Sequence, residues 1–317
     1  MKKLICVLVL FFIFTQLKAK PILPIEANPP LKLPNPWIAG TLSAVFPGAG
    51  YFYNGDVAGG LVGVGVAIPL MGGQFLPSPQ RSSLVAAQVS LLSRNAYGYL
   101  LFDSYQQALD LNGRPTLKIN HPRYSPIELL MSPLKPTNYR FKRVWIPLLV
   151  GAAGVVANVS SKGVVADGGR LAIGIPLTIL QALVIGAGEE SEFRGFYHPA
   201  FSELSGSRVV GNLAQASLFG LCHTTIPGCA SPQLTGLAVR QLGRGSLTNS
   251  VVNDGTDFGR FAGTFLFGMI AGWVAGDPEA GLPSSIAFHA AWDAMQLIGD
   301  LMTTNESPLY FSMSFAF

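Results

Sequence analysis

The ionisable residues of this sequence that could do chemistry lie at the end of an apolar run. Residues 171–187 are almost wholly apolar, and residues 188–195 then read Gly-Glu-Glu-Ser-Glu-Phe-Arg-Gly. Charge in hydrocarbon costs several kcal/mol, so three carboxylates and a guanidinium at such a place indicate a site rather than simple packing. Glu190 and Arg194 are four residues apart, which puts them on one helical face and makes an ion pair available.

Two of the four histidines lie in other apolar segments. His223 follows Phe219 by four residues, and His289 precedes Asp293 by four residues. Residues at this spacing share a helical face, so the Asp293 carboxylate can orient the His289 imidazole or face the same cavity. A single buried histidine is more often a packing residue, but three apolar segments with such pairs indicate one shared site. Glu192, by contrast, is predicted to be solvated and to take no part.

The elements that must position these residues are membrane helices. The chain has 317 residues, of which 49% are hydrophobic and 12% are charged. Soluble proteins carry roughly 25% charged residues, so the composition predicts an all-α, polytopic membrane protein with about seven to eight membrane helices. The net charge of +4 is modest and spread out, which excludes a nucleic-acid footprint. We therefore expect the lipid bilayer, and no nucleic acid, as a partner.

The N-terminus has the pattern of a secretory signal peptide. Met1-Lys2-Lys3 is a basic start, and residues 4–14 form an apolar core. We assign residues 1–19 to this peptide, with an uncleaved anchor as the alternative. The peptide and the expected helices together predict a multi-pass protein of a bacterial inner membrane.

Two apolar runs, 37–53 and 57–76, follow a proline-rich stretch and surround Asn54-Gly55-Asp56. Asn-Gly is a strong turn signal, so the runs predict a helical hairpin whose first arm is broken at residues 47–50, Pro-Gly-Ala-Gly. Residues 43–56 are similar to the "PGxGxxYxG" hairpin of the TM2-like domains. That resemblance implies no known chemistry.

Composition also divides the rest of the chain. We assign residues 20–103 to an N-terminal membrane hairpin region and residues 104–143 to a polar linker. Residues 144–303 form a region of apolar segments that holds the candidate site, and residues 304–317 form a C-terminal tail. The basic excess of the linker predicts a cytoplasmic position for it.

Glycine recurs every four residues in one apolar segment, at Gly268, Gly272 and Gly276. This spacing predicts close packing of that helix against a neighbour. The cysteines, Cys6, Cys222 and Cys229, imply no disulfide framework.

Three motifs in order give the sequence a family resemblance. Glu189-Glu190-x-x-x-Arg194, Phe219-x-x-x-His223 and His289-x-x-x-Asp293 resemble the motifs of the CPBP (CAAX protease and bacteriocin-processing, or Abi) intramembrane endopeptidases. The resemblance covers residues 144–303 and implies a helical core of the CPBP type.

The resemblance implies a role for each motif residue. Glu189 is the general base that activates a water, and His223 helps to hold that water. His289 and Asp293 stabilise the oxyanion, while Glu190, Arg194 and Phe219 support the site. Asp293 departs from the best-studied branch, which has Asn there. An ionised carboxylate cannot donate to an oxyanion, which makes orientation of His289 or a metal role more plausible for it.

The sequence leaves cofactor and function alternatives open. We favour no cofactor, although Glu189, His223 and His289 would be the ligands if zinc were bound. The predicted function is an endopeptidase acting on a peptide or membrane-protein substrate. The alternatives are a zinc-dependent version, a non-catalytic membrane scaffold, and a transporter, although no internal repeat supports transport.

Overall fold

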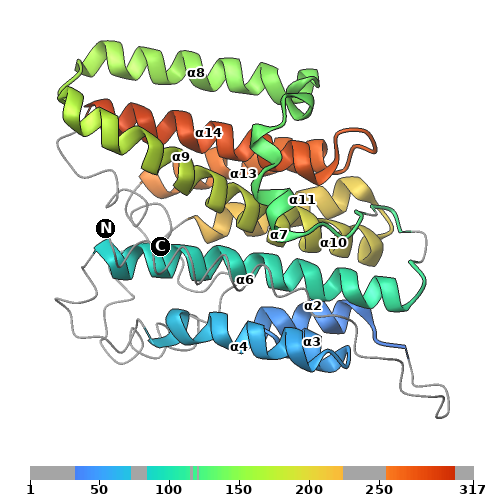
Figure 1. The fold of residues 1–317 in the computed structure, drawn as a ribbon. Helices are drawn as coiled ribbons and strands as arrows, with labels where there is room; N and C mark the ends of the chain where they lie inside the picture. Colours follow the sequence, from blue (N-terminus) through green and yellow to red (C-terminus); the bar gives the residue numbers. More distant parts are fainter. Residues whose placement is uncertain (1–32, 73–83, 115–116, 120, 224–254, 304–317) are drawn as a thin grey trace.

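The computed structural model describes residues 33–72, 84–114, 117–119, 121–223 and 255–303. These residues form helices and connecting turns without a strand (Figure 1), which confirms the predicted all-α fold. The predicted signal peptide and C-terminal tail, together with Cys6 and Cys229, lie outside the described residues.

The N-terminal hairpin forms as the sequence predicts, with a broken first arm. Its helices are α2 (Pro36–Val45), α3 (Ala49–Tyr53) and α4 (Val57–Gly72). The Asn35 side chain caps α2, and Gly48 takes a left-handed conformation (φ 93°) at the break. Gly55 is also left-handed (φ 83°), as the Asn-Gly turn requires. The two arms touch at Gly48 and Gly63, where any side chain on Gly63 would overlap the other arm.

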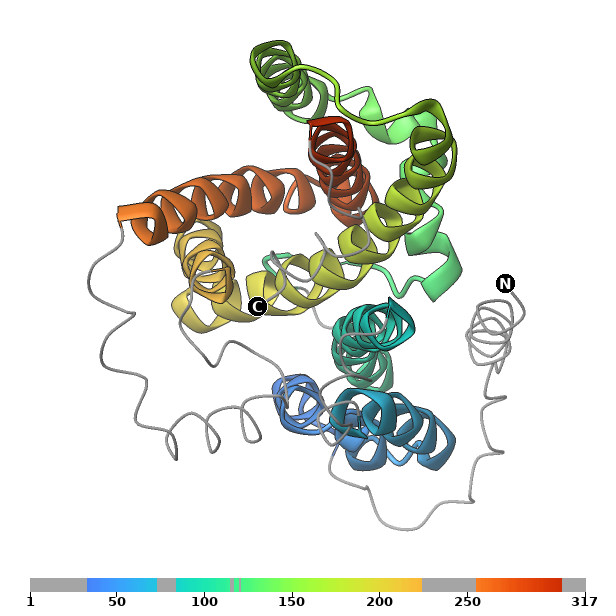
Figure 2. The same ribbon diagram turned by 90° about the vertical axis from the view of Figure 1, so that its left-hand side faces the viewer.

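Helix α6 (Leu84–Leu111) lies between the hairpin and the rest of the molecule. It packs against α2 and α4 on one side and against α9 on the other, as both views show (Figures 1 and 2). The helix runs past residue 103, where the predicted linker begins, because polar residues such as Asp103 and Ser104 are buried and paired instead of entering a loop.

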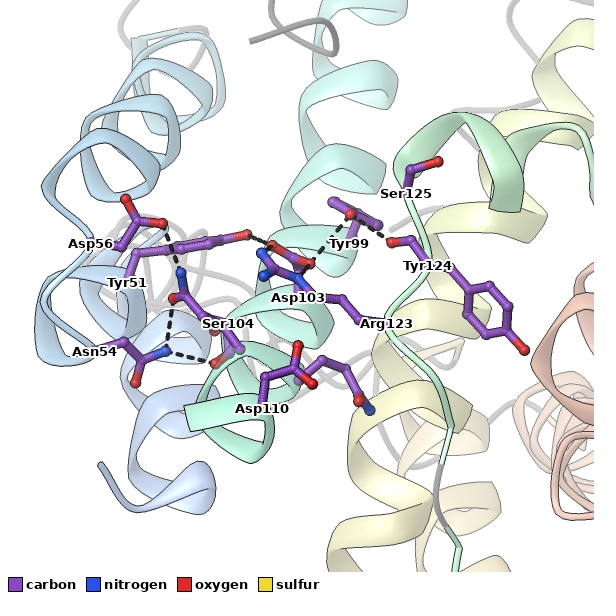
Figure 3. Close-up of polar contacts among 12 residues, drawn as sticks. Tyr51, Asn54, Asp56, Tyr99, Asp103, Ser104, Asp110, Arg123, Tyr124 and Ser125 are labelled. Carbon is purple, nitrogen blue, oxygen red and sulfur yellow. Dashed lines mark hydrogen bonds and ion pairs between the residues drawn. The ribbon is translucent and has the colours of Figure 1, made fainter. Parts of the chain in front are cut away.

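Asp103 joins three parts of the chain (Figure 3). It accepts a hydrogen bond from the Tyr51 hydroxyl of α3 at 2.6 Å and two from the Arg123 guanidinium of the linker, at 2.6 and 2.7 Å. The Asn54 amide donates to the backbone carbonyl of Ser104 at 2.8 Å, next to this contact. We call the contact of Asp103 with Tyr51 and Arg123 the Asp103 clamp. It fixes α6 relative to both the hairpin and the linker.

The linker is ordered as short helices rather than a simple loop. It contains α7 (Pro126–Leu130), η2 (Ser132–Leu134) and η3 (Pro136–Tyr139). Ser125 and Glu128 form a reciprocal capping box that starts α7.

The second half of the chain is a helical bundle that surrounds the candidate site. Its elements are α8 (Lys142–Lys162), α9 (Gly168–Glu190), η4 (Ser191–Tyr197), α10 (His198–Ser205), α11 (Arg208–Cys222), α13 (Gly255–Ala275) and α14 (Gly281–Thr303). Helix α9 packs along α14, and α11 packs along α13. On α13, a Cβ at Gly268 would lie 3.2 Å from Ala216, and one at Gly272 would overlap Asn212. The predicted glycine spacing therefore does allow close packing.

Three stretches of the described residues are long and apolar enough to cross a membrane: Lys142–Lys162, Gly168–Ser205 and Phe258–Ala275. Large apolar side chains such as Leu149, Val150 and Val156 are exposed on α8, as expected for a lipid-facing helix. The other segments expected to span fall short of this criterion. Helix α11 has only 15 residues, and α6 and α14 carry several buried polar side chains. The chain is a helical membrane protein.

Candidate active site

The site lies where α9 passes into a π-helical segment. Glu189 and Glu190 are the last two residues of α9, and Arg194 lies in η4. Single π-helical turns inside α-helices occur frequently at functional sites. The sequence predicted a regular helix here, because nothing in its apolar pattern marks the wider turn. The Glu190–Arg194 ion pair forms nonetheless, with Nη1 2.9 Å from Oε1.

Glu190 is the fully buried centre of the site. Besides the Arg194 ion pair, its Oε1 accepts a hydrogen bond from His289 Nδ1 at 2.7 Å. Its second oxygen accepts one from the Ser285 hydroxyl, and both partners come from α14. A buried carboxylate is tolerated only with such partners. Glu190 thus ties α9 to α14, and it forms the predicted ion pair.

His289 is surrounded by carboxylates. Its Nδ1 carries a proton, since the Glu190 carboxylate it contacts can only accept. Its Nε2 lies 3.4 Å from Asp293 Oδ2 and 3.8 Å from Glu189 Oε2. The i, i+4 relation expected between His289 and Asp293 therefore holds, and Asp293 faces the same space as Glu189.

His223 ends α11 and completes the cluster. Its Nδ1 lies 2.7 Å from the backbone oxygen of Phe219, so that nitrogen donates and Nε2 is left to face Glu189, 3.7 Å from Oε2. The Phe219 ring packs on His223 with a centroid distance of 4.3 Å. The same ring lies 4.3 Å from the Arg194 guanidinium carbon, so Phe219 forms one wall of the site.

Glu189 is where the three motifs meet. Its Oε2 faces both His223 and His289 and has no hydrogen-bond partner among the described residues. The side chain is 18% exposed, while Glu190 is completely buried. Two adjacent carboxylates therefore have different surroundings: Glu190 is satisfied by protein groups, whereas Glu189 Oε2 is buried between the two histidines without a hydrogen-bond partner among the described residues.

The sequence suggests a metal-ligand set in this cluster. Glu189, His223 and His289 are suitable donors by type. Across the part of the chain that the structure describes, however, no group of three or more His, Cys, Asp or Glu residues has an arrangement that would hold a metal ion.

The prediction that Glu192 is solvated is wrong. Its side chain is fully buried, and Oε2 lies 2.6 Å from Nη1 of Arg94. Glu192 contacts α6, whereas Glu189 faces α11 and α14, and sequence spacing alone could not reveal this difference. The cation that compensates it lies almost a hundred residues away in the sequence.

Sequence reasoning also missed Ser285 and Arg94 as site residues. Ser285 precedes His289 by four residues, and this spacing was the available signal. Arg94 is a cation inside an otherwise weakly polar helical segment. Burying a charge in an apolar bundle costs free energy unless a partner compensates it, and this cost was the signal for Arg94.

The fold is that of a helical membrane protein, and its candidate site is a buried cluster of carboxylates and histidines. Comparison with protein-family models matches residues 171–295 to the family described as "Type II CAAX prenyl endopeptidase Rce1-like". This match covers 125 of the 317 residues and is consistent with a CAAX protease family, the resemblance that the three motifs indicated. At the level of the family, this supports a membrane endopeptidase. Neither the curated proteins nor the solved structures gave a match.

The matched segment contains every motif residue but not Arg94, the hairpin or the linker. The similarity of the hairpin to TM2-like domains, and the division of the chain into regions, stay predictions.

Proposed function

We propose that this chain is an intramembrane endopeptidase in which Glu189 activates a water for peptide-bond hydrolysis. The observation that supports the proposal is the position of Glu189 Oε2, which lies 3.7 and 3.8 Å from the Nε2 atoms of His223 and His289 and has no hydrogen-bond partner in the part of the chain that the structure describes. These separations are too long for direct hydrogen bonds, but one water can hydrogen-bond to all three groups.

In the proposed mechanism, Glu189 accepts a proton from the water while the water oxygen attacks the scissile carbonyl carbon. A C–O bond forms, and the carbonyl oxygen becomes an oxyanion. Glu189 then returns the proton to the leaving nitrogen as the C–N bond breaks, giving a carboxylic acid and an amine. His223 holds the water, and Glu190 and Arg194 hold the helix and His289 in place.

His289 is the proposed partner of the oxyanion, with Asp293 orienting it. When His289 carries both protons, Nδ1–H donates to Glu190 and Nε2–H can donate to the oxyanion. Asp293 lies 3.4 Å from that Nε2, so its carboxylate is placed to align the ring rather than to bind the oxyanion itself.

The experiment uses the purified full-length chain and two quenched fluorescent peptides of one sequence, one unmodified and one farnesylated near a CAAX-type C-terminus. The family name suggests the second, and the predicted secretory leader favours the first. Glu189→Gln should reduce kcat by about a hundredfold or more, since proton transfer is lost. The matched control is Glu279→Gln at an exposed turn. Full activity in Glu189→Gln would refute the proposal.

We propose that catalysis needs no metal. Active protein should keep its turnover after treatment with a membrane-compatible chelator, and elemental analysis should find less than one zinc per chain. Stoichiometric zinc whose removal abolishes cleavage would instead establish the zinc-dependent alternative, with Glu189, His223 and His289 as ligands.

The proposed location is a bacterial inner membrane, which the chain crosses several times. Labelling of introduced cysteines from either side of the membrane would test this location.

A further inference from the structure

A histidine of the linker contacts the main chain of the candidate active site. His121 is buried, and its Nε2 lies 3.2 Å from the carbonyl oxygen of Arg194. A carbonyl oxygen can only accept a hydrogen bond, so this nitrogen carries a proton and donates. His121 lies outside residues 171–295, the segment that matches the protease family. The contact therefore brings a side chain from another part of the chain to the first motif.

The Arg194 carbonyl needs such a donor because of the turn that contains it. Arg194 lies in η4, where π-helical pairing joins a carbonyl to the N–H five residues on, and the His198 N–H accordingly donates to Phe193. The residue five positions after Arg194 is Pro199, which has no N–H. The π-helical pattern therefore supplies no main-chain donor for the Arg194 carbonyl.

Pro199 leaves one carbonyl without a main-chain donor in either helical register. With α-helical pairing, four residues on, that carbonyl belongs to Gly195, whereas with π-helical pairing it belongs to Arg194. A buried carbonyl without a donor is costly, and both residues are buried. Because His121 supplies its N–H at Arg194, it stabilises the π-helical register against the α-helical one.

The register of η4 determines where the charged side chains of the first motif lie. Successive residues of an α-helix are turned by about 100°, so a shift by one residue would rotate one side of the turn against the other by that amount. From within this turn, Arg194 Nη1 reaches Glu190 Oε1 at 2.9 Å, and the same oxygen binds His289 Nδ1 at 2.7 Å. The pairing of the main chain in η4 thus affects the groups that surround the site.

His121 is itself held in place by the linker. Arg114 Nη1 donates to the His121 carbonyl at 3.0 Å, and Ile119, two residues before His121, is buried. Two residues after His121, Arg123 binds both oxygens of Asp103 in the Asp103 clamp. These contacts fix the imidazole relative to the helices, so the linker, for which the sequence gave no chemistry, contributes to the geometry of the site.

We propose that His121 is a positioning residue of the active site, whose hydrogen bond to the Arg194 carbonyl holds η4 in the π-helical register that places Arg194 against Glu190. The inference rests on the proposed function, in which these residues support the general base. His121 acts through the main chain and does not touch the substrate.

The first test is amide hydrogen exchange, followed by mass spectrometry, on the purified full-length chain. His121→Leu removes the donor, and exchange of residues 191–198 should become about tenfold faster, since one hydrogen bond of this turn is lost. His121→Gln keeps an amide that can donate, so its exchange should stay close to that of the unchanged protein. The matched control is Lys118→Leu at an exposed position of the linker, which should change nothing. Unchanged exchange in His121→Leu, or equal acceleration in His121→Gln, would overturn the inference.

The second test is steady-state hydrolysis of the fluorescent peptide, with kcat calculated per folded molecule. His121→Leu should lower kcat by about tenfold and leave KM nearly unchanged, because the site is misaligned while substrate contacts stay intact. His121→Gln should keep most of the kcat. A variant that only folds less well would keep its kcat per folded molecule, so an unchanged kcat in His121→Leu would overturn the positioning role.

Pro199 provides an independent check. Pro199→Ala supplies a main-chain N–H five residues after Arg194, which can replace the imidazole as donor. His121→Leu should therefore lower the unfolding temperature less in Pro199→Ala than in the unchanged protein. Equal losses in both backgrounds would show that His121 acts by packing alone and would overturn the inference.

The outcomes of these tests are separate from that of the proposed function. Exchange and unfolding need no substrate, so they can contradict the role of His121 while Glu189→Gln still abolishes peptide cleavage. Conversely, full activity in Glu189→Gln would refute the proposed function and leave the exchange result of His121→Leu as it is.

Discussion

Glu190 Oε1 and His289 Nδ1 lie 2.7 Å apart, although the two residues are 99 positions apart in the sequence. This hydrogen bond joins the first motif to the third and sets which nitrogen of His289 faces Glu189. Within the described ranges, Oε2 of the adjacent Glu189 has no hydrogen-bond partner. The consecutive glutamates of the first motif therefore have different surroundings: Glu190 joins two helices, and Glu189 faces the histidines of the other two motifs.

Replacing Glu190 by Ala should destabilise the protein strongly. The change would leave the fully buried Arg194 without its carboxylate, and breaking a buried ion pair in this way costs about 3–5 kcal/mol. Thermal unfolding in detergent measures the loss, with Glu279→Ala as the control at an exposed position. If both variants unfold at the same temperature, the anchoring role of Glu190 is wrong.

Replacing Asp293 distinguishes its two candidate roles. If Asp293 orients His289, Asp293→Asn should lower kcat by about tenfold and leave KM nearly unchanged, because the weaker amide contact affects the transition state most. Asp293→Ala should lower kcat further. The measurement is steady-state hydrolysis of the fluorescent peptide. An Asn variant more active than the unchanged protein would assign this position to the oxyanion instead.

The sequence predicted the helical class, the hairpin and the three motifs because each depends on local patterns. Apolar runs, the Asn54-Gly55 turn and four-residue spacings are all contained within single segments. The contacts of Glu190 with Arg194 and of His289 with Asp293 follow from the same helical geometry.

What the sequence could not provide depends on packing between distant segments. Glu192 looked exposed because its partner, Arg94, lies on a helix that only the folded structure places beside it. Helix α6 continues to Leu111 because Asp103 is paired with Tyr51 and Arg123, which no periodicity reveals. The π-helical turn of η4 likewise has no signature in the apolar pattern.

The Asp103 clamp should contribute measurably to stability. Tyr51→Phe removes one hydrogen bond to a buried carboxylate, which is worth about 1.5–3 kcal/mol, and thermal unfolding should report that loss. Tyr53→Phe is the matched control, since Tyr53 is half-exposed and its hydroxyl accepts a hydrogen bond from the Asn35 backbone N–H. Equal unfolding temperatures for the two variants would show that the clamp adds nothing to stability.

His121 should make the protein less stable at mildly acidic pH. It lies buried in the linker, its Nε2 is 3.2 Å from the Arg194 carbonyl oxygen, and burial lowers the pKa of this imidazole to about 4. The unfolded chain has the ordinary value near 6.5, so it binds more protons than the folded chain between these two pH values.

The sign of the pH effect follows from that difference. The contribution of His121 to stability is fully present above about pH 6.5 and is lost as the pH falls toward 4, by about 3 kcal/mol in total. Unfolding temperatures measured from pH 7.5 to 4 should therefore fall less steeply for His121→Gln, whose amide does not titrate and can still donate to the Arg194 carbonyl. Parallel curves for this variant and the unchanged protein would mean that His121 does not titrate differently in the folded and unfolded states.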